Sequence, residues 1–337
     1  MIQLAEYPLV SVIIPTYNNE SRIGETLKSI IAQDYPALEI IVVNDASTDT
    51  TEEMARRVLE GSGRDFSIIN HPANRGASAA RNTGLDAAKG EYVWFCDGDD
   101  LAERPFVSTL TFLCQRHECD ISCCGIADRF EDGAPDLPHP LKLRVSQIIN
   151  GETMTWERVL NHIAPNFCCM ILRRDFLVAT GVRFTEGCTA GEDVEFQIEA
   201  FCRAKSVALT PECLYIYIHH SGMGQVRDKD SKEKILRRYL HNTEAHFRTA
   251  KYLRQYAPSQ RLKSLAENCL LPEAVIRRLT LCAKAGDRTM FDRLLANITI
   301  RQNLRRARKS FFLKPEVFLK ALGLLCFPDL YYRIRKG

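Results

Sequence analysis

The 337-residue sequence lacks any uninterrupted run of 18 apolar residues, so we expect no helix that crosses a membrane. Its 13 cysteines form no C-x-x-C pair, and none has the spacing to a histidine that is typical of zinc sites. No secretory signal, internal repeat or low-complexity tract is present. These absences favour a reducing compartment in which the thiols act as small apolar side chains, and they argue against a zinc protein.

Positive charge is scarce in the first two thirds of the chain. Residues 1–224 contain 19 Lys and Arg against 32 Asp and Glu, a net charge of −13. Residues 225–337 contain 26 against 10, a net charge of +16. Such an asymmetry predicts two regions with different roles. We expect a catalytic domain over residues 1–224 and a helical, basic region over residues 225–337.

The most informative stretch is Y-V-W-F-C-D-G-D-D, in which an apolar run, 92–96, leads directly into Asp97, Asp99 and Asp100. The run is typical of a buried parallel strand, and ligands of open α/β sheets bind beyond the carboxyl ends of such strands. Three carboxylates within four residues repel one another unless a cation offsets them, and oxygen ligands suit Mg²⁺ or Mn²⁺. The alternative is an acidic turn, with Asp100 capping the next helix and Glu103 in its first turn.

Alternating strands and helices predict the fold. Spacings of 25 to 30 residues between strands indicate βαβ units and a mostly parallel, Rossmann-like sheet with helices on both faces. The expected strands are residues 10–15, 39–44, 66–69, 92–96, 120–127, 167–172 and 213–218. The expected helices include residues 22–33, 106–117, 152–163 and 175–180. Three further helices are expected to begin near residue 49, within residues 74–84 and at Glu192. Ser47 or Thr48 would cap the helix near residue 49, with Glu52 as the partner in a capping box.

Polar residues follow the first strands where each one ends. Tyr17 offers an aromatic face, Asp45 can accept a hydrogen bond from a base or a ribose hydroxyl, and Arg81 can reach a diphosphate. Each residue also has an ordinary structural alternative. Tyr17 could cover a loop, Asp45 could be an acid at the start of a helix, and Arg81 could form a surface ion pair. Together, beside the D-G-D-D turn, they favour a site for a metal and a nucleotide.

Five motifs make the resemblance specific: V-S-V-I-I-P-T-Y-N, E-I-I-V-V-N-D-A-S-T-D, N-R-G-A-S-A-A-R-N-T-G-L, F-C-D-G-D-D and G-E-D-V-E-F. In this order, over roughly residues 8 to 220, they resemble the family 2 glycosyltransferases of the GT-A fold. The resemblance implies a nucleotide-diphosphosugar donor, expected to be a UDP-sugar, a Mn²⁺ or Mg²⁺ ion and inversion at the anomeric carbon. The chain departs from the commoner D-D-G-S of the family with N-D-A-S, and Arg75 occupies a variable position.

The resemblance also assigns site residues. Asp99 would coordinate the metal on the diphosphate. The other residues share the nucleotide-sugar pocket: Pro15, Thr16, Tyr17, Asn18, Asp45, Asn74, Gly76, Arg81, Asp97 and Gly98.

Asp193 is the candidate catalytic base. Inversion needs one carboxylate that takes the proton of the attacking acceptor hydroxyl, and a metal-bound diphosphate leaves without a protonated acid. Glu192 is expected to orient the acceptor, although both acids could instead only cap the helix that they begin. His219 and His220 could reach the metal or the diphosphate, or could be structural.

Further absences narrow the reaction. The Q-x-x-R-W element of the family's processive synthases is missing, since the only Trp residues are Trp94 and Trp156, so we expect one sugar to be added per encounter. The acceptor is expected to be a glycan or lipid-linked molecule of cell-surface polysaccharide synthesis. Two alternatives stay open: a degenerate membrane-associated scaffold, and a sugar nucleotidyltransferase. P-T-Y-N-N-E lacks the glycine-rich phosphate loop of the latter.

The basic C-terminal region predicts a second partner. Arg301 to Lys309 places five cations within nine residues, and Phe311, Phe312 and Leu313 follow closely. This combination is typical of a helix that lies on an anionic membrane surface. We therefore expect a cytoplasmic protein held peripherally on the inner face of the cell membrane. The alternative is a tail that packs its apolar stripe on the catalytic domain, and no recognition motif supports nucleic acid.

Overall fold

The computed structural model describes residues 7–220 and 232–336 of the chain, which divides into two compact units. Unit 1 takes its described residues from segments 7–151, 163–187 and 204–220, and unit 2 from 152–162, 188–203 and 232–336. No helix in these ranges is long and apolar enough to cross a membrane.

Unit 1 is built on one ten-stranded sheet. Its strands are β1 (Val10–Thr16), β2 (Leu38–Asn44), β3 (Asp65–Asn70), β4 (Tyr92–Phe95), β5 (Leu101–Ala102), β6 (Ile121–Phe130), β7 (Leu137–His139), β8 (Gln147–Asn150), β9 (Met170–Arg173) and β10 (Ser206–His219). Its helical elements are α1 (Ile23–Ile31), α2 (Thr51–Glu60), α3 (Ala77–Ala87), α4 (Phe106–His117), η1 (Phe167–Cys169) and α6 (Arg174–Thr180).

The sheet is parallel in its first half and mixed in its second. The strand order is β3-β2-β1-β4-β9-β6-β10-β5, with β7 on β6 and β8 on β10. The first four strands pair in parallel, as do β6 and β10, whereas β9 runs antiparallel to both of its neighbours. This α/β sheet with a helical C-terminal region confirms the predicted fold class.

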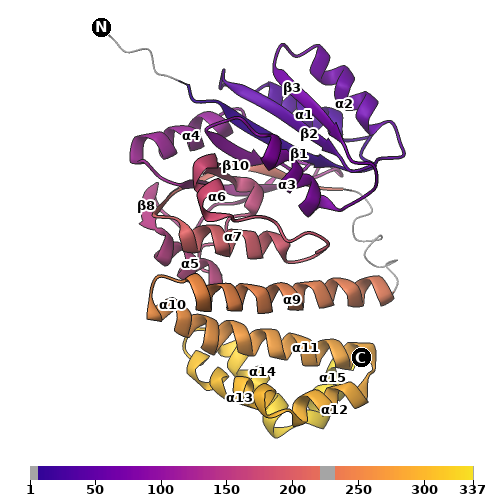
Figure 1. The fold of residues 1–337 in the computed structure, drawn as a ribbon, viewed down its shortest axis with the longest axis vertical. Helices are drawn as coiled ribbons and strands as arrows, with labels where there is room; N and C mark the ends of the chain where they lie inside the picture. The colour runs from indigo at the N-terminus through magenta and orange to yellow at the C-terminus, as the bar shows by residue number, and fades with distance from the viewer. Residues whose placement is uncertain (1–6, 221–231, 337) are drawn as a thin grey trace. The chain divides into compact units, whose positions relative to one another are not determined.

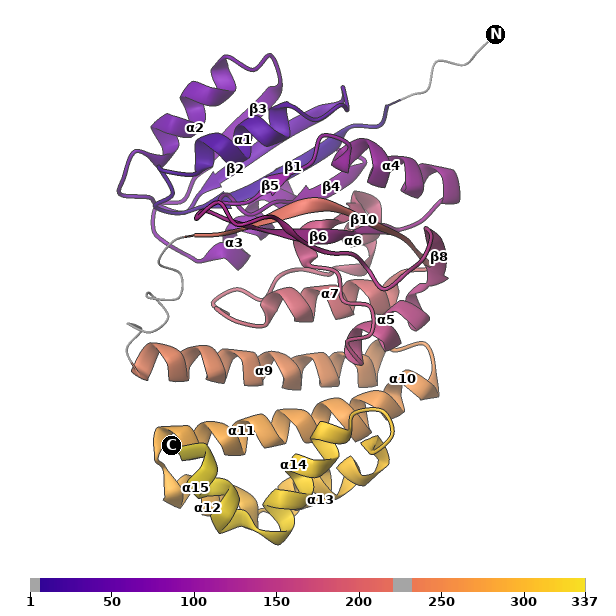
Figure 2. The same ribbon diagram turned by 180° about the vertical axis from the view of Figure 1, so that it is seen from behind.

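Central strand β1 carries the core of unit 1. Every residue from Val10 to Thr16 is buried, in register with both β2 and β4. Right-handed crossovers place α1 and α2 on one face of the sheet and α3 on the other, as Figures 1 and 2 show. Helix α3 lies against β1 so closely that a Cβ at Gly84 would overlap the side chain of Ile13. The small residues of α3 therefore bring its Arg81 to the carboxyl ends of the strands.

Some local predictions were wrong. Helix α2 begins after Thr50 with no side-chain cap, and the first helical amide, that of Thr51, donates instead to Asp49 at 3.0 Å. Asp100 does not cap a helix, because β5 follows it and α4 begins only after Pro105. Residues 167–169 form a 3₁₀ turn, and β9 begins at Met170.

Unit 2 is helical. Its elements are α5 (Gly151–Val159), α7 (Glu192–Arg203), α9 (Lys232–Tyr256), α10 (Gln260–Leu265), η2 (Ala266–Leu270, a π-helical turn), α11 (Leu271–Ala285), α12 (Arg288–Ala296), α13 (Ile298–Arg306), η3 (Ala307–Ser310), α14 (Pro315–Cys326) and α15 (Pro328–Lys336).

Two apolar clusters hold unit 2 together. In the first, Leu160 and Ile198 pack with Leu253 and Leu262, joining α5 and α7 to the C-terminal helices. In the second, Phe291 packs with α11, α14 and α15. The sequence-based boundary after residue 224 assigned α5 and α7 to the catalytic domain, whereas their side chains pack with α9 and α10 in unit 2. Contacts of this kind join residues far apart in sequence, and helical periodicity alone does not reveal them.

Candidate functional site

A pocket of about 360 Å³ opens in unit 1 where β1, β2 and β4 end. This is the edge at which parallel α/β sheets bind ligands. Most of the site residues predicted from the sequence line it together: Pro15, Thr16, Tyr17, Asn18, Asp45, Arg81, Asp97, Gly98 and Asp99. Asn19, Arg22, Ala77 and Ala80 complete the lining and were not predicted.

The loop that follows β1 is hydrogen-bonded to the backbone of the acidic turn, residues 97–100. The carbonyl oxygen of Gly98 accepts hydrogen bonds from Asn19 Nδ2 at 2.5 Å and Thr26 Oγ1 at 2.9 Å. A Cβ at Gly98 would lie 3.1 Å from the carbonyl oxygen of Pro15, so a larger residue would push the two segments slightly apart. Tyr17 remains 49% exposed beside this contact. Its ring is free to cover a flat ligand.

Asp45 holds the loop between β3 and α3 in place. Its carboxylate is 2% exposed and accepts hydrogen bonds from the backbone N–H groups of Arg75 at 2.9 Å and Gly76 at 2.7 Å. His71 Nδ1 lies 2.7 Å from the same carboxylate, and its Nε2 lies 2.9 Å from Thr83 Oγ1. A carboxylate has about four acceptor positions, so one remains for a ligand. The sequence analysis missed His71, because nothing in its local sequence marks it.

Arg81 is held against the acidic turn. Its guanidinium donates to Asp97 Oδ1 at 2.8 Å and lies over the rings of Phe167 at 4.4 Å and Phe184 at 5.1 Å. The side chain is 6% exposed, whereas that of Asp97 is 30% exposed. The aromatic rings and the carboxylate fix the orientation of this cation at the wall of the pocket.

Asp99 and Asp100 occupy different environments. Burial raises the pKa of Asp99, and the charge of Asp97 raises it further, while His220 and Arg22 lower it. Burial raises the pKa of Asp100 to about 8, although Asp100 accepts hydrogen bonds from the Ile218 N–H at 3.0 Å and the Tyr215 hydroxyl at 2.9 Å. Asp100 therefore ties the acidic turn to β10, and Asp99 faces the pocket.

Strand β10 brings one histidine to Asp99. His220 Nε2 lies 3.5 Å from Asp99 Oδ2, and its Nδ1 lies 2.7 Å from Glu131 Oε1. An Nδ1–H donor to Glu131 leaves Nε2 directed at Asp99, which is the arrangement of a histidine oriented by a carboxylate. His219 instead lies 3.3 Å from Asp128 and stacks on Phe130. The rest of the predicted glycine-bearing loop, 221–225, lies outside the described residues.

The remaining predicted residues lie outside the pocket lining. Asn74 is exposed, and Gly76 acts through its backbone N–H on Asp45. Glu192 and Asp193 begin α7 in unit 2. Burial lowers the pKa of Arg158, and the charge of Asp193 raises it by less, so the pKa of Arg158 lies below its usual value.

A divalent cation fits the chemistry of the acidic turn. Asp99 is a carboxylate whose side chain is 40% exposed to the pocket, it lies near the charge of Asp97, and an imidazole nitrogen is directed at it. No group of three or more His, Cys, Asp or Glu side chains in the described ranges is arranged to hold a metal ion. A cation here would thus take its other ligands from diphosphate and water oxygens, as Mg²⁺ commonly does.

Comparison with known proteins agrees with this geometry. A solved structure of Staphylococcus aureus TarS in complex with UDP-GlcNAc aligns with a TM-score of 0.65 at 21% identity, over 97% of this chain and 88% of that one. TarS itself is named a poly(ribitol-phosphate) beta-N-acetylglucosaminyltransferase. The mannosyltransferase PcManGT from Pyrobaculum calidifontis, in complex with GDP-Man and Mn²⁺, aligns with a TM-score of 0.54 at 19% identity, over 96% and 89%. The fold is therefore of the GT-A type.

Sequence relatives identify the family. The model of glycosyl transferase family 2 matches residues 11–178. EpsJ of Bacillus subtilis (strain 168), named an uncharacterized glycosyltransferase, is 34% identical over 215 residues, which are 62% of this chain and 61% of that protein. YibD of Escherichia coli (strain K12), also named an uncharacterized glycosyltransferase, is 30% identical over 234 residues, which are 68% of this chain and 67% of that protein. This chain belongs to glycosyltransferase family 2.

Proposed function

We propose that this protein is an inverting glycosyltransferase that moves one hexosyl or hexosaminyl group from a UDP-sugar to a hydroxyl of a glycan or lipid-linked acceptor. The observation that carries the proposal is the pocket of unit 1, in which the strand-end residues of β1, β2 and β4 surround Asp97 and Asp99. UDP-GlcNAc in the TarS structure supports a nucleotide-sugar donor of this kind. The name of GgaB of Bacillus subtilis (strain 168), a minor teichoic acid biosynthesis protein that is 31% identical over 210 residues, supports an acceptor of the cell surface.

The pocket suggests a role for each donor-binding residue. The exposed ring of Tyr17 stacks on the base, and Asp45 offers its remaining acceptor position while it holds the loop of Gly76. Arg81 offers its fixed guanidinium to the diphosphate, and Asp97 accepts from a hydroxyl of the ribose or the sugar. Asn74, which is exposed on the adjoining loop, contacts the donor from outside the pocket lining in this proposal.

Asp99 would hold a Mn²⁺ or Mg²⁺ ion, with His220 as a second protein ligand and Glu131 orienting the imidazole. When bound, such an ion offsets the charge of the diphosphate and makes it a better leaving group. Arg22, which also lines the pocket and lowers the pKa of Asp99, adds positive charge on the same side.

Asp193 takes the proton of the acceptor hydroxyl. It stands in the first turn of α7, where the helix dipole stabilises an anion, and it remains partly exposed. Glu192, beside it, accepts a hydrogen bond from the acceptor and orients it. One base and an unassisted leaving group are what a single displacement with inversion requires.

Donor binding tests the proposal. Thermal unfolding of the full chain should be measured with UDP-, GDP- and CDP-sugars, each with and without Mn²⁺. We expect a UDP-sugar with Mn²⁺ to raise the midpoint, because a ligand at 100 times its dissociation constant stabilises the folded state by about 2.7 kcal/mol. Tyr17→Ala should reduce the shift, and Tyr7→Ala, an exposed tyrosine outside the pocket, is the control. No shift with any nucleotide sugar would contradict the proposal.

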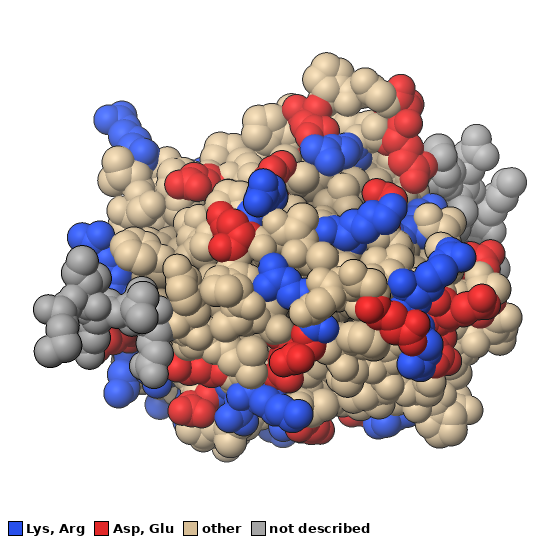
Figure 3. Space-filling view, turned by 90° about the horizontal axis from the view of Figure 1, so that it is seen from above, with Lys and Arg blue, Asp and Glu red and all other residues tan. Residues whose placement is uncertain are grey.

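The C-terminal helices are proposed to dock on an anionic membrane. Exposed apolar side chains gather there, with Phe312 92% exposed and Phe327, Leu330 and Ile334 each more than half exposed. The same segment supplies the charge excess of residues 225–337, and each cation near an anionic surface contributes about 1 kcal/mol. On the face drawn in Figure 3, by contrast, Lys and Arg side chains are mixed with Asp and Glu. That face shows no patch of a single sign.

Sedimentation with anionic liposomes checks this docking. The wild-type chain should sediment with them and be released by salt, because the attraction is electrostatic in part. Phe312→Ser should weaken the association, whereas Val178→Ser, which removes a 62% exposed apolar side chain from α6 of unit 1, should not. Point variants give a clearer test than deletion of residues 225–337, because the deletion would also remove α9, on which α5 and α7 pack. Equal recovery of Phe312→Ser and wild type would refute the proposed surface.

A further inference from the structure

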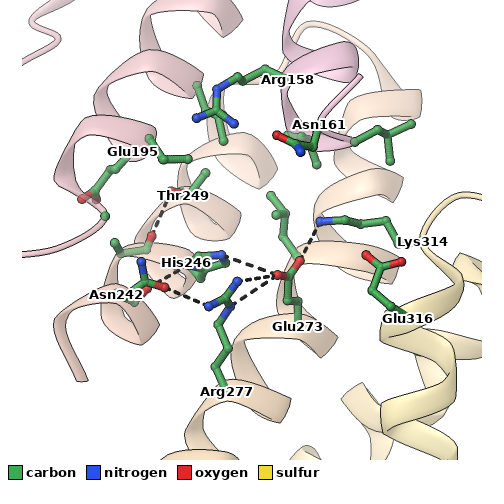
Figure 4. Close-up of a pocket in the computed structure, with 17 residues that line it drawn as sticks. Arg158, Asn161, Glu195, Asn242, His246, Thr249, Glu273, Arg277, Lys314 and Glu316 are labelled. Carbon is green, nitrogen blue, oxygen red and sulfur yellow. Dashed lines mark hydrogen bonds and ion pairs between the residues drawn. The ribbon is translucent and has the colours of Figure 1, made fainter. Parts of the chain in front are cut away.

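We propose that a second cavity, which lies wholly in unit 2, binds a phosphate-bearing polyol. The cavity measures about 490 Å³ and is enclosed by the end of α5, the start of α7, α9, α11 and the start of α14 (Figure 4). Sites for small organic molecules usually measure roughly 300–1,000 Å³. The cavity is therefore large enough for more than a bare ion.

One wall of the cavity holds two cations around one buried carboxylate. The carboxylate of Glu273 pairs with Lys314 Nζ at 2.7 Å and with Arg277 at 2.9 Å. Burial raises the pKa of Glu273, but Lys314, His246 and Arg277 lower it more, to about 2. Burial and Arg277 lower the pKa of His246, while Glu273 raises it. Two permanent cations thus share one carboxylate.

The facing wall contributes a third cation. Arg158 donates from Nε and an Nη to the amide oxygen of Gln197, at 3.0 Å each, and burial lowers its pKa. In the part of the chain that the structure describes, no carboxylate accepts a hydrogen bond from this guanidinium. Figure 4 shows Arg158 entering from one side of the cavity and Glu273, Arg277 and Lys314 lying on the other.

The other carboxylates of the lining do not cancel this excess. Both oxygens of Glu195 accept from Arg248, at 2.7 Å each, so a neighbouring cation already pairs with this acid. Glu316 is exposed at the start of α14, where solvent screens its charge. An anion between Arg158 and the pair of Arg277 and Lys314 would give Arg158 an anionic partner and would add a second one for the two cations that share Glu273.

The geometry favours phosphate among anions. Two guanidinium groups and one ammonium line the cavity from two sides, which suits an oxyanion that accepts several hydrogen bonds at once. Beyond the cations, Asn161 and Glu316 offer partners for hydroxyl groups, and Leu160 and Val194 offer contact for a carbon backbone. A phosphate attached to a polyhydroxylated chain uses all of these features.

The position of the cavity suggests which substrate carries this phosphate. Its lining includes Gly191 and Val194, which flank the proposed base, and Arg158 interacts electrostatically with Asp193 itself. If the proposed function holds, the ligand is a phosphate of the acceptor. The binding of the phosphate-bearing polyol does not depend on that function and can be measured without any transfer.

Isothermal titration of the full chain with glycerol 3-phosphate tests the proposal. Saturating UDP and Mg²⁺ are included, so that the probe cannot report on the pocket of unit 1. We expect saturable binding of one molecule per chain, weaker binding of inorganic phosphate and none of glycerol. Arg158→Gln should weaken binding about 10-fold or more, because a charge-assisted hydrogen bond is lost, and Arg158→Lys should retain part of it. Arg116→Gln, which removes an exposed cation from α4 of unit 1, should leave the binding of glycerol 3-phosphate as it is in wild type.

A second variant keeps the test valid if Arg158→Gln does not fold. Asn161 is exposed and has a φ of 62°, a conformation that aspartate also tolerates. Asn161→Asp should fold normally and weaken binding, because it adds a carboxylate to the lining. The proposal is overturned if glycerol 3-phosphate does not bind, or if Arg158→Gln or Asn161→Asp binds it like wild type. If inorganic phosphate bound as tightly as glycerol 3-phosphate, the polyol would contribute nothing to binding, and the proposal that the ligand is a polyol would be refuted. Loss of UDP binding alone would contradict the proposed function and leave this site intact.

Discussion

Asp193→Asn is expected to remove sugar transfer while donor binding stays nearly unchanged. The amide has the size of the carboxylate and can still begin α7, but it cannot take a proton from the acceptor hydroxyl. Loss of a general base lowers turnover by about 10²-fold or more. Donor binding should persist, because the pocket that we assign to the donor is built from unit 1 and Asp193 belongs to unit 2. A single-turnover assay and titration with UDP-sugar plus Mn²⁺ measure the two quantities separately.

The matched control for this variant is Asp175→Asn. Asp175 is also an acid in the first turn of a helix, α6, and it is exposed. The same chemical change there should leave transfer and binding as they are in wild type. Normal transfer by Asp193→Asn would show that the assigned base is wrong, even if donor binding is as expected.

Asp99→Ala should abolish the metal-dependent part of donor binding. Asp99 is the carboxylate of the acidic turn that faces both the pocket and His220 Nε2, at 3.5 Å. Its removal leaves two acids in the turn: Asp97, which is paired with Arg81 at 2.8 Å, and Asp100, which accepts hydrogen bonds from β10. Titration of the variant with UDP-sugar should therefore give the same weak affinity with and without Mn²⁺, whereas Mn²⁺ should strengthen binding to the wild type.

Asp65→Ala provides the comparison for Asp99→Ala. Asp65 is an exposed carboxylate at the start of β3, outside the lining of the pocket, so its loss should not change the effect of Mn²⁺. If Asp99→Ala kept a full Mn²⁺-dependent gain in affinity, the metal would have to be bound elsewhere, and the assignment would fail.

Local patterns were sufficient to predict most of unit 1. Continuous apolar runs such as those of β1 and β2 indicate strands buried on both faces, and their spacing indicates parallel pairing. Residues that directly follow these strands were therefore predicted to meet, and the structure places Tyr17, Asp45 and Asp97 around one pocket. The short strands β5 and β7 were missed, because two or three residues carry no periodic signal.

Contacts between distant segments could not be predicted in the same way. His71 reaches Asp45 across 26 positions, and His220 reaches Glu131 across 89, and neither pair has a sequence spacing that marks it. The assignment of α7 to unit 2 depends on apolar contacts with α9 and α10. The cavity around Arg158 likewise combines residues from five separate segments of the chain.

The anomeric configuration of the product tests the central claim most directly. The full chain should be supplied with an α-linked UDP-sugar, Mn²⁺ and a hydroxyl-bearing glycan or lipid-linked acceptor, and the purified product examined by NMR. A single displacement with one base predicts a β-linked product that carries one added sugar. An α-linked product would contradict inversion, and a long polymer would contradict the addition of one sugar per encounter.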